Sequence, residues 1–309
     1  MVSSLGVPVL KVLGAGWVLS LALGAVYLFP LRSDIWGLGT GVLFAITVLV
    51  SILLARRRIA LSVDIDNVYL VAGYLSLVSI VFTFCVMAII AGYLLPFMGD
   101  LIYIIAIFGA LVLVGVLNED IPIYQLAFYE ESSSILTVTR GLALGSIMYL
   151  IAYWLTGGLT IVEANQLMIG YLTTKLQVEE LVGILFLMIF TVAIPEELLS
   201  RVFYFNVGSN VATAPLASLL MITTWYALHA VTRYFLSGGS LVLFIITLGG
   251  LVITVGYALY GFLCAVFTHA IYNTLIYATT YFGGVATAIA AVLIALNFLV
   301  ARYLGVRAL

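Results

Sequence analysis

Long apolar runs separated by short polar stretches dominate this chain. A membrane-spanning helix needs about 20 mostly apolar residues, and the runs reach or approach that length. They are continuous rather than alternating, which is typical of helices and not of a membrane β-barrel. The pattern predicts about eight to ten transmembrane helices. They are expected at 12–31, 35–55, 68–97, 101–117, 141–156, from 181 to beyond 195, at 212–235, twice within 240–280, and at 285–301.

Two connections between these runs are markedly more polar than the rest, and we expect loops there. The first covers 118–140, where an interfacial helix is an option, and the second covers 157–180. The run 240–280 is too long for one helix, so we divide it into two. Four glycines allow a break within it: Gly249, Gly250, Gly256 and Gly261.

Composition narrows the class of protein. Of the 309 residues, 65% are hydrophobic and 8% are charged, whereas soluble domains carry about 25% charged residues. This excludes a soluble enzyme, a disordered chain and a nucleic-acid-binding protein, which needs a basic surface. We therefore expect an all-α, polytopic integral membrane bundle that forms a single domain over 1–309, without internal repeats. Cys85 and Cys264 lie inside apolar runs and are interpreted as small hydrophobic side chains.

The basic residues predict an orientation in the membrane. Cytoplasmic loops carry an excess of Lys and Arg. If the triple-arginine loop is cytoplasmic, eight of the 11 Lys and Arg residues fall on or near that side. Both termini are then cytoplasmic, and the active site is expected toward the same side. The eight are Lys11, Arg56, Arg57, Arg58, Arg140, Arg201, Arg302 and Arg307; Arg32, Lys175 and Arg233 fall opposite.

An unusual charged segment follows Pro195, where an apolar run meets Glu196, Glu197 and then Arg201. Proline breaks a helix or occupies its first turn. On the second interpretation the two glutamates lie in the first turn, where the helix dipole favours negative charge. Arg201 follows Glu197 by four residues, so the two can form an ion pair. The alternative is that the helix ends at the membrane surface and all three side chains are solvated.

The chain has two histidines, and both lie within predicted spans. Trp225 precedes His229 by four residues, and Asn273 follows His269 by four, so each pair shares a helical face. An interhelical hydrogen bond would explain either histidine alone. Together with the glutamates they favour hydrolysis of an acyl or peptide bond by water. A carboxylate and an imidazole can deprotonate water, and an imidazole with an amide can stabilise an oxyanion.

A metal site is an alternative use of the same side chains. One glutamate and two histidines can hold a metal ion with one open position. The His-Glu-x-x-His motif of zinc proteases is absent from the sequence, however. Intramembrane ionisable residues also form the proton relays and substrate sites of transporters. No inverted repeat is visible in the sequence, which counts against a transporter.

Taken in order, the polar residues resemble the motifs of a known family, the CPBP group of CAAX proteases and bacteriocin-processing enzymes, also called the ABI family. Its members include the type II CAAX prenyl endopeptidases. The resemblance covers about 195–273, and the sequence departs from it at the tryptophan, where the family usually has Phe. The three motifs are Glu196-Glu197-x-x-x-Arg201, Trp225-x-x-x-His229 and His269-x-x-x-Asn273.

The resemblance implies an intramembrane endopeptidase whose helices surround a polar cavity. It implies N-terminal helices over 1–180, catalytic helices over 181–282 and a C-terminal helix over 283–309. It also implies a metal-independent glutamate mechanism without a cofactor, with a divalent metal as the open alternative. The implied roles are as follows: Glu196 and His229 activate water, His269 and Asn273 form the oxyanion site, and Glu197, Arg201 and Trp225 orient and support the cavity.

The resemblance implies a membrane-associated peptide or a prenylated protein as the substrate, reached from the lipid bilayer. The eukaryotic members of the family remove the three residues that follow a prenylated cysteine. Nothing in this sequence identifies such a tail, so prenyl-protein processing is one of several options. A nonenzymatic immunity or scaffold protein, in which the same residues serve binding, remains a further alternative.

Overall fold

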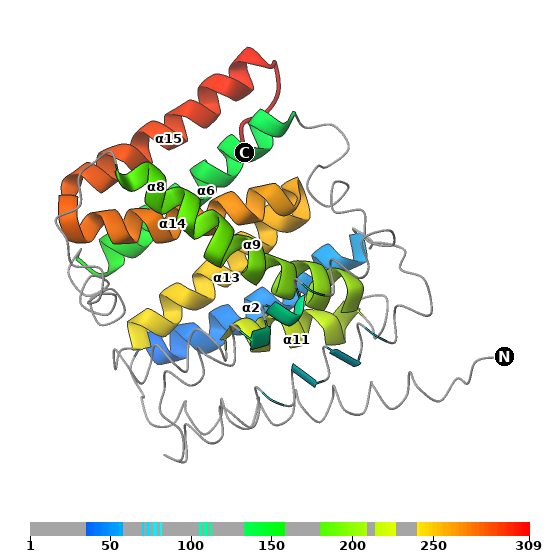
Figure 1. Ribbon diagram of the computed structural model, residues 1–309. Helices are drawn as coiled ribbons and strands as arrows, with labels where there is room; N and C mark the ends of the chain where they lie inside the picture. The colour runs from blue at the N-terminus through cyan, green and yellow to red at the C-terminus, as the bar shows by residue number, and fades with distance from the viewer. Residues whose placement is uncertain are drawn as a thin grey trace. The chain divides into compact units, whose positions relative to one another are not determined.

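The described part of the chain is entirely helical in its regular structure. The computed structural model describes residues 35–57, 133–157, 180–208, 214–226 and 240–309, with helical residues in groups of one to three between 70 and 112. No strand occurs in these ranges, which confirms the all-α prediction. The helices are α2 (Ile35–Arg57), α6 (Ser134–Leu155), α8 (Glu180–Leu187), the π-helix η2 (Met188–Ala193), α9 (Ile194–Glu197), the π-helix η3 (Leu198–Val207), α11 (Ala214–Tyr226), α13 (Ser240–Tyr260), α14 (Phe262–Phe282) and α15 (Gly284–Tyr303) (Figure 1).

Six helical runs in the described ranges are long and apolar enough to cross a membrane, judged by length and composition. This confirms a polytopic helical membrane protein. The predicted span at 12–31, most of those at 68–97 and 101–117, and residues 227–235 of the span at 212–235 lie outside the described residues, so these spans stay predictions. The six runs are Ile35–Ala55, Ser134–Leu155, Glu180–Asn206, Ser240–Tyr260, Phe262–Thr279 and Gly284–Tyr303.

Two compact units interleave along the chain. The first comprises Met1–Ile123 and Leu198–Gly250, and the second comprises Tyr124–Glu197 and Leu251–Leu309. Both later boundaries fall inside helical runs, one between α9 and η3 and the other within α13.

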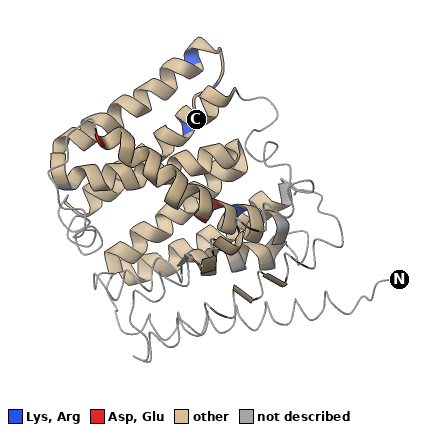
Figure 2. Cartoon of the chain, in the orientation of Figure 1, with Lys and Arg blue, Asp and Glu red and all other residues tan. Residues whose placement is uncertain are grey.

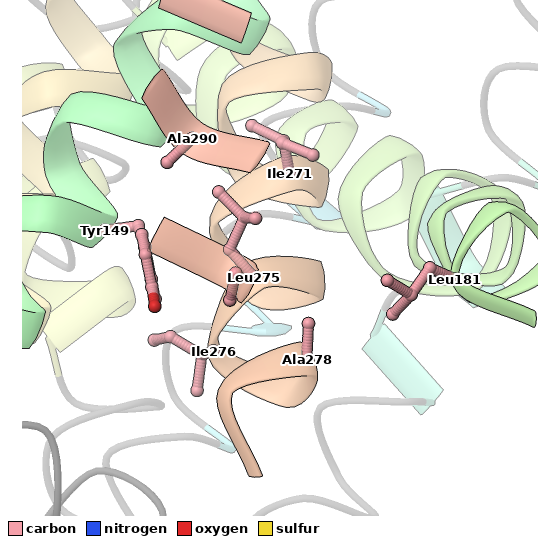
Figure 3. Close-up of a cluster of buried hydrophobic side chains, with 8 residues drawn as sticks. Tyr149, Leu181, Ile271, Leu275, Ile276, Ala278 and Ala290 are labelled. Carbon is pink, nitrogen blue, oxygen red and sulfur yellow. The ribbon is translucent and has the colours of Figure 1, made fainter. Parts of the chain in front are cut away.

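In the second unit, α14 is the central helix. It packs against α6, α15, α8 and η2, and Figure 1 shows α6, α14 and α15 side by side. Their buried apolar side chains form a cluster around the second half of α14, with Tyr149 from α6 and Leu181 from α8 on different sides of that helix (Figure 3). The Tyr149 hydroxyl also shares a hydrogen bond of 2.6 Å with the Thr279 hydroxyl. Apolar packing and this bond together fix α6 against α14.

The start of α6 corrects one sequence prediction. We expected a loop through Arg140, but the helix begins at Ser134, and the Ser133 hydroxyl caps it by accepting from the Leu136 N–H. The Arg140 side chain is partly buried and bonds to backbone carbonyls. Its Nε donates to the Ala308 carbonyl (2.9 Å) and its Nη2 to the Arg307 carbonyl (2.8 Å). These bonds allow a charged residue inside the helix. They also bring Arg140 and Arg307 together, as the predicted orientation requires, although the side of the membrane stays a prediction.

The break within 240–280 falls at Gly261, which confirms the division into two helices. Its φ of 91° lies in a region that side chains other than glycine rarely adopt. The Gly261 N–H still donates to the Tyr257 carbonyl, at 2.9 Å, so α13 ends with a satisfied donor. Gly283, with φ of 52°, separates α14 from α15 in the same way. These two glycines set where the helices around the site begin and end.

In the first unit, α2 shows how polar residues are accommodated in an apolar helix. The hydroxyls of Thr40, Thr47 and Ser51 are buried, and each donates to the carbonyl four residues earlier at 2.7 Å. Large apolar side chains such as Leu38 and Leu49 are exposed instead. Small polar residues that face the protein while large apolar residues face outward are typical of membrane helices.

Candidate active site

The helix that carries the two glutamates runs without interruption from Glu180 to Asn206 and contains two π-helical segments. The Ile194 N–H donates to the Ile189 carbonyl, five residues earlier. Pro195 has no N–H to donate and lies just after this π segment. Pro195 is the second residue of α9, whose first turn holds both glutamates, but the helical residues of η2 precede α9 directly, so α9 has no free N-terminus. The helix-dipole argument for the glutamates loses its basis, while π segments inside helices are frequent at functional sites.

The charged residues after Pro195 are buried, so the alternative of solvated side chains at a helix end is wrong. Glu196 is 7% exposed, and Glu197 and Arg201 are 0% exposed. In Figure 2 the described helices are almost entirely tan, so few of their residues are charged. Burying an ionised side chain is costly unless it is paired. The question for each of them is therefore which group it meets.

Both glutamates face His269, which lies on α14 and is 4% exposed. His269 Nδ1 lies 2.8 Å from Glu197 Oε1, within hydrogen-bond distance, and its Nε2 lies 3.7 Å from Glu196 Oε2. Each ring nitrogen thus has a carboxylate of its own. An imidazole whose Nδ1–H bonds to Glu197 has a fixed ring orientation and presents Nε2 to Glu196. The three groups form a buried acid–base cluster within one compact unit.

Sequence reasoning named all three residues but missed their pairing. Glu197 and His269 are 72 residues apart in the chain, and no local pattern links them. The only signal was energetic, because a histidine in an apolar helix needs a partner. We expected Arg201 to pair with Glu197, and that ion pair stays a prediction.

Arg201 and Trp225 meet in the first unit. The Arg201 guanidinium carbon lies 4.3 Å from the centre of the Trp225 ring, and Arg201 Nη2 donates to the Gly250 carbonyl at 3.2 Å. The Trp225 Nε1–H donates to the Ile246 carbonyl at 3.4 Å. A cation over an indole ring is a stabilising contact. Arg201 and Trp225 therefore pack on each other, and both bond to backbone carbonyls of α13. The contact with Gly250 was not predicted from the sequence.

Two further predicted site residues are Asn273 and His229. Asn273 is half-buried on α14, one turn after His269, whereas His229 lies outside the described residues. Among the residues that the structure does describe, no three His, Cys, Asp or Glu side chains are arranged to hold a metal ion. That finding does not include His229, so the metal-independent mechanism stays a prediction. Cys264 is a buried free thiol, as expected.

The helices and the buried cluster define a class, namely a multi-pass membrane protein with an acid–base site between its helices. Residues 178–275 match the family model of the Rce1-like proteins, described as type II CAAX prenyl endopeptidase Rce1-like. The match spans all three motifs and agrees with the resemblance drawn from them. It supports a CAAX-protease-type membrane endopeptidase as the general class. The chain matched no curated protein and no solved structure.

Proposed function

We propose that the protein is an intramembrane endopeptidase in which water, activated by Glu196 and His229, hydrolyses a peptide bond of a membrane-associated substrate. The observation that carries this proposal is the buried cluster of two glutamates and His269, inside the segment that matches the Rce1-like family. A buried acid–base cluster of this kind has little value for packing, since apolar residues fill such a space at lower cost. Its chemistry is the more direct reason for its presence.

In the proposed reaction Glu196 is the general base. It accepts a proton from water that His229 holds in place, and the water oxygen attacks the carbonyl carbon of the scissile peptide bond. Asn273 and His269 Nε2 donate hydrogen bonds to the oxyanion that forms on the carbonyl oxygen. As the carbon–nitrogen bond breaks, Glu196 returns the proton to the leaving amine. The 3.7 Å between Glu196 Oε2 and His269 Nε2 supports this assignment, because it brings the base and the oxyanion donor to the same reacting group.

Glu197 has a separate role in this scheme. Because the ring faces Glu197 through Nδ1 at 2.8 Å, a donor role for Nε2 requires a proton on both nitrogens of His269. The two carboxylates offset the positive charge of that imidazolium. Glu197 thereby fixes the orientation of His269. The scheme needs no metal ion.

For the substrate we propose a peptide held at the membrane by a lipid group, with prenylated proteins as the leading candidates. The Rce1-like match supports this class of substrate. A lipid-anchored peptide also reaches a site between membrane helices by diffusing within the bilayer.

The test is a cleavage assay with the purified, reconstituted chain. Farnesylated C-terminal peptides and a mixed peptide library are offered to wild type, Glu196→Ala and His229→Ala, and products are identified by mass spectrometry. We expect cleavage by wild type alone. The absence of product from both substrate sets, or variants that cleave as well as wild type, overturns the proposal. Loss of activity on chelation that zinc restores would refute the metal-free mechanism.

A further inference from the structure

The two helices α6 and α14 approach to backbone distance at two glycines. A Cβ at Gly145 would lie 2.3 Å from the Thr268 carbonyl oxygen and 2.4 Å from the Ile271 side chain. A Cβ at Gly141 would lie 2.7 Å from the Cys264 carbonyl oxygen. The two glycines are four residues apart and share one face of α6. This spacing is the small-x-x-x-small pattern that lets membrane helices pack closely.

Gly145 makes the tighter of these two approaches. The obstacle at Gly145 is the main chain of α14, which cannot rotate out of the way as a side chain can. Gly183 on α8 offers the opposite case, because nothing lies within 4 Å of a Cβ placed there. Gly256 is intermediate, with its nearest atom, a Leu144 methyl carbon, at 3.3 Å. Glycine is therefore required at position 145 by the position of α14, whereas at position 183 it is not.

The contact lies directly beside the proposed active site. Thr268, whose carbonyl meets Gly145, immediately precedes His269 in the chain. The helix α14 also packs against α9, which carries both glutamates. Since α6, α9 and this part of α14 belong to the same compact unit, the closeness of α6 and α14 sets where His269 stands relative to Glu197.

We propose that Gly145 is a positioning residue for the reaction, which holds α14 at the distance that gives His269 its bond to Glu197. This inference rests on the proposed function of the same site. A normal contact between carbon and a carbonyl oxygen is about 3.3 Å, so Gly145→Ala must displace α14 by roughly 1 Å. A displacement of that size in a catalytic group can cost about 100-fold in rate. We expect kcat to fall by about that factor while KM changes little, because in the proposed reaction His269 acts on an oxyanion that forms only after the substrate is bound.

A purely structural glycine would behave differently, and the histidine itself reports the difference. In protein labelled with ¹⁵N-histidine, the Nδ1 and Nε2 signals of His269 are assigned by their loss in His269→Gln. The wild-type Nδ1 signal should show a strong hydrogen bond to a carboxylate, and Gly145→Ala should weaken it. Gly183→Ala makes the same chemical change on another helix and should leave both the signal and the rate as in wild type.

A second variant covers the case in which Gly145→Ala does not fold. Gly141→Ala meets the Cys264 carbonyl, which is five residues before His269, and the clash there is smaller. We expect an intermediate loss of kcat and an intermediate change of the Nδ1 signal. If either folded variant keeps the wild-type kcat and the wild-type signal, the proposal is wrong. It is also wrong if the loss of rate comes from KM alone.

The same measurements separate this inference from the proposed function. If wild type cleaves no substrate but Gly145→Ala still changes the Nδ1 signal of His269, the peptidase proposal fails and the positioning role stands. If wild type cleaves peptides and Gly145→Ala matches it in kcat and in the signal, the positioning role fails and the peptidase proposal stands.

Discussion

Replacing Glu197 by Gln probes the hydrogen bond between Glu197 and His269 without emptying the site. Glutamine keeps the shape of the side chain and an oxygen that accepts a hydrogen bond, but it removes the negative charge. The bond is 2.8 Å long, and both side chains are buried. A hydrogen bond to a charged group contributes about 1.5–3 kcal/mol, which corresponds to roughly 10- to 150-fold in rate if it is needed in the transition state.

We expect Glu197→Gln to lower kcat by a factor in that range and to leave the fold intact. Glu197→Ala should be worse, because it removes the acceptor as well and leaves a buried His269 nitrogen without its partner. Rates are measured on a farnesylated peptide with chain reconstituted in liposomes. Thermal unfolding is followed in parallel, so that a loss of folded protein is not counted as a loss of rate.

Glu180→Gln is the matched control. It removes a carboxylate at the start of α8, in the same helical run as Glu197, and should leave kcat unchanged. The reasoning is refuted if Glu197→Gln and Glu197→Ala both retain the wild-type rate. It is also refuted if the two variants lose rate equally, since the charge and the hydrogen bond then make no separate contributions.

The remaining predictions concern stability. Gly250→Ala places a Cβ 2.9 Å from the Trp225 indole, so we expect the free energy of unfolding to fall by about 1–3 kcal/mol, measured by thermal unfolding. An unchanged unfolding midpoint would contradict the close packing of Arg201 and Trp225 against Gly250. Gly261→Ala forces a residue with a side chain to adopt φ of 91° and should lower the free energy of unfolding by about 1–3 kcal/mol in the same measurement. An unchanged midpoint would show that the break between α13 and α14 does not depend on glycine. Arg140→Ala removes two hydrogen bonds to the last residues, so carboxypeptidase should digest the C-terminus faster than in wild type; equal digestion rates would show that these bonds do not hold it.

The fold class and several helix limits could be predicted from the sequence because membrane helices are specified by composition. Runs of about 20 apolar residues have few alternatives in a bilayer, and Gly261 is the residue that permits the abrupt turn within 240–280. The earlier start of α6 was not predicted. Ser133 stands just before an apolar run, which is typical of a helix N-cap, but the polar residues around it favoured a loop.

The arrangement of the site was harder to predict for a physical reason. Glu196, Glu197 and His269 were identified by the cost of burying them, which depends only on their local surroundings. Their pairing depends on how α9 packs against α14, and no local sequence pattern specifies how two helices pack. The π-helical segments around Pro195 were missed as well, because the local sequence does not show whether an N–H bonds to the carbonyl four or five residues earlier. The close approach of α6 to α14 at Gly141 and Gly145 was not predicted either.

The most direct test of the central claim is the initial rate at which liposome-reconstituted Glu196→Gln cleaves a farnesylated peptide, relative to Glu180→Gln and wild type. General-base catalysis contributes about 100- to 10,000-fold, so Glu196→Gln should fall by at least the lower of these factors while Glu180→Gln keeps the wild-type rate. A Glu196→Gln rate equal to that of wild type would contradict the account.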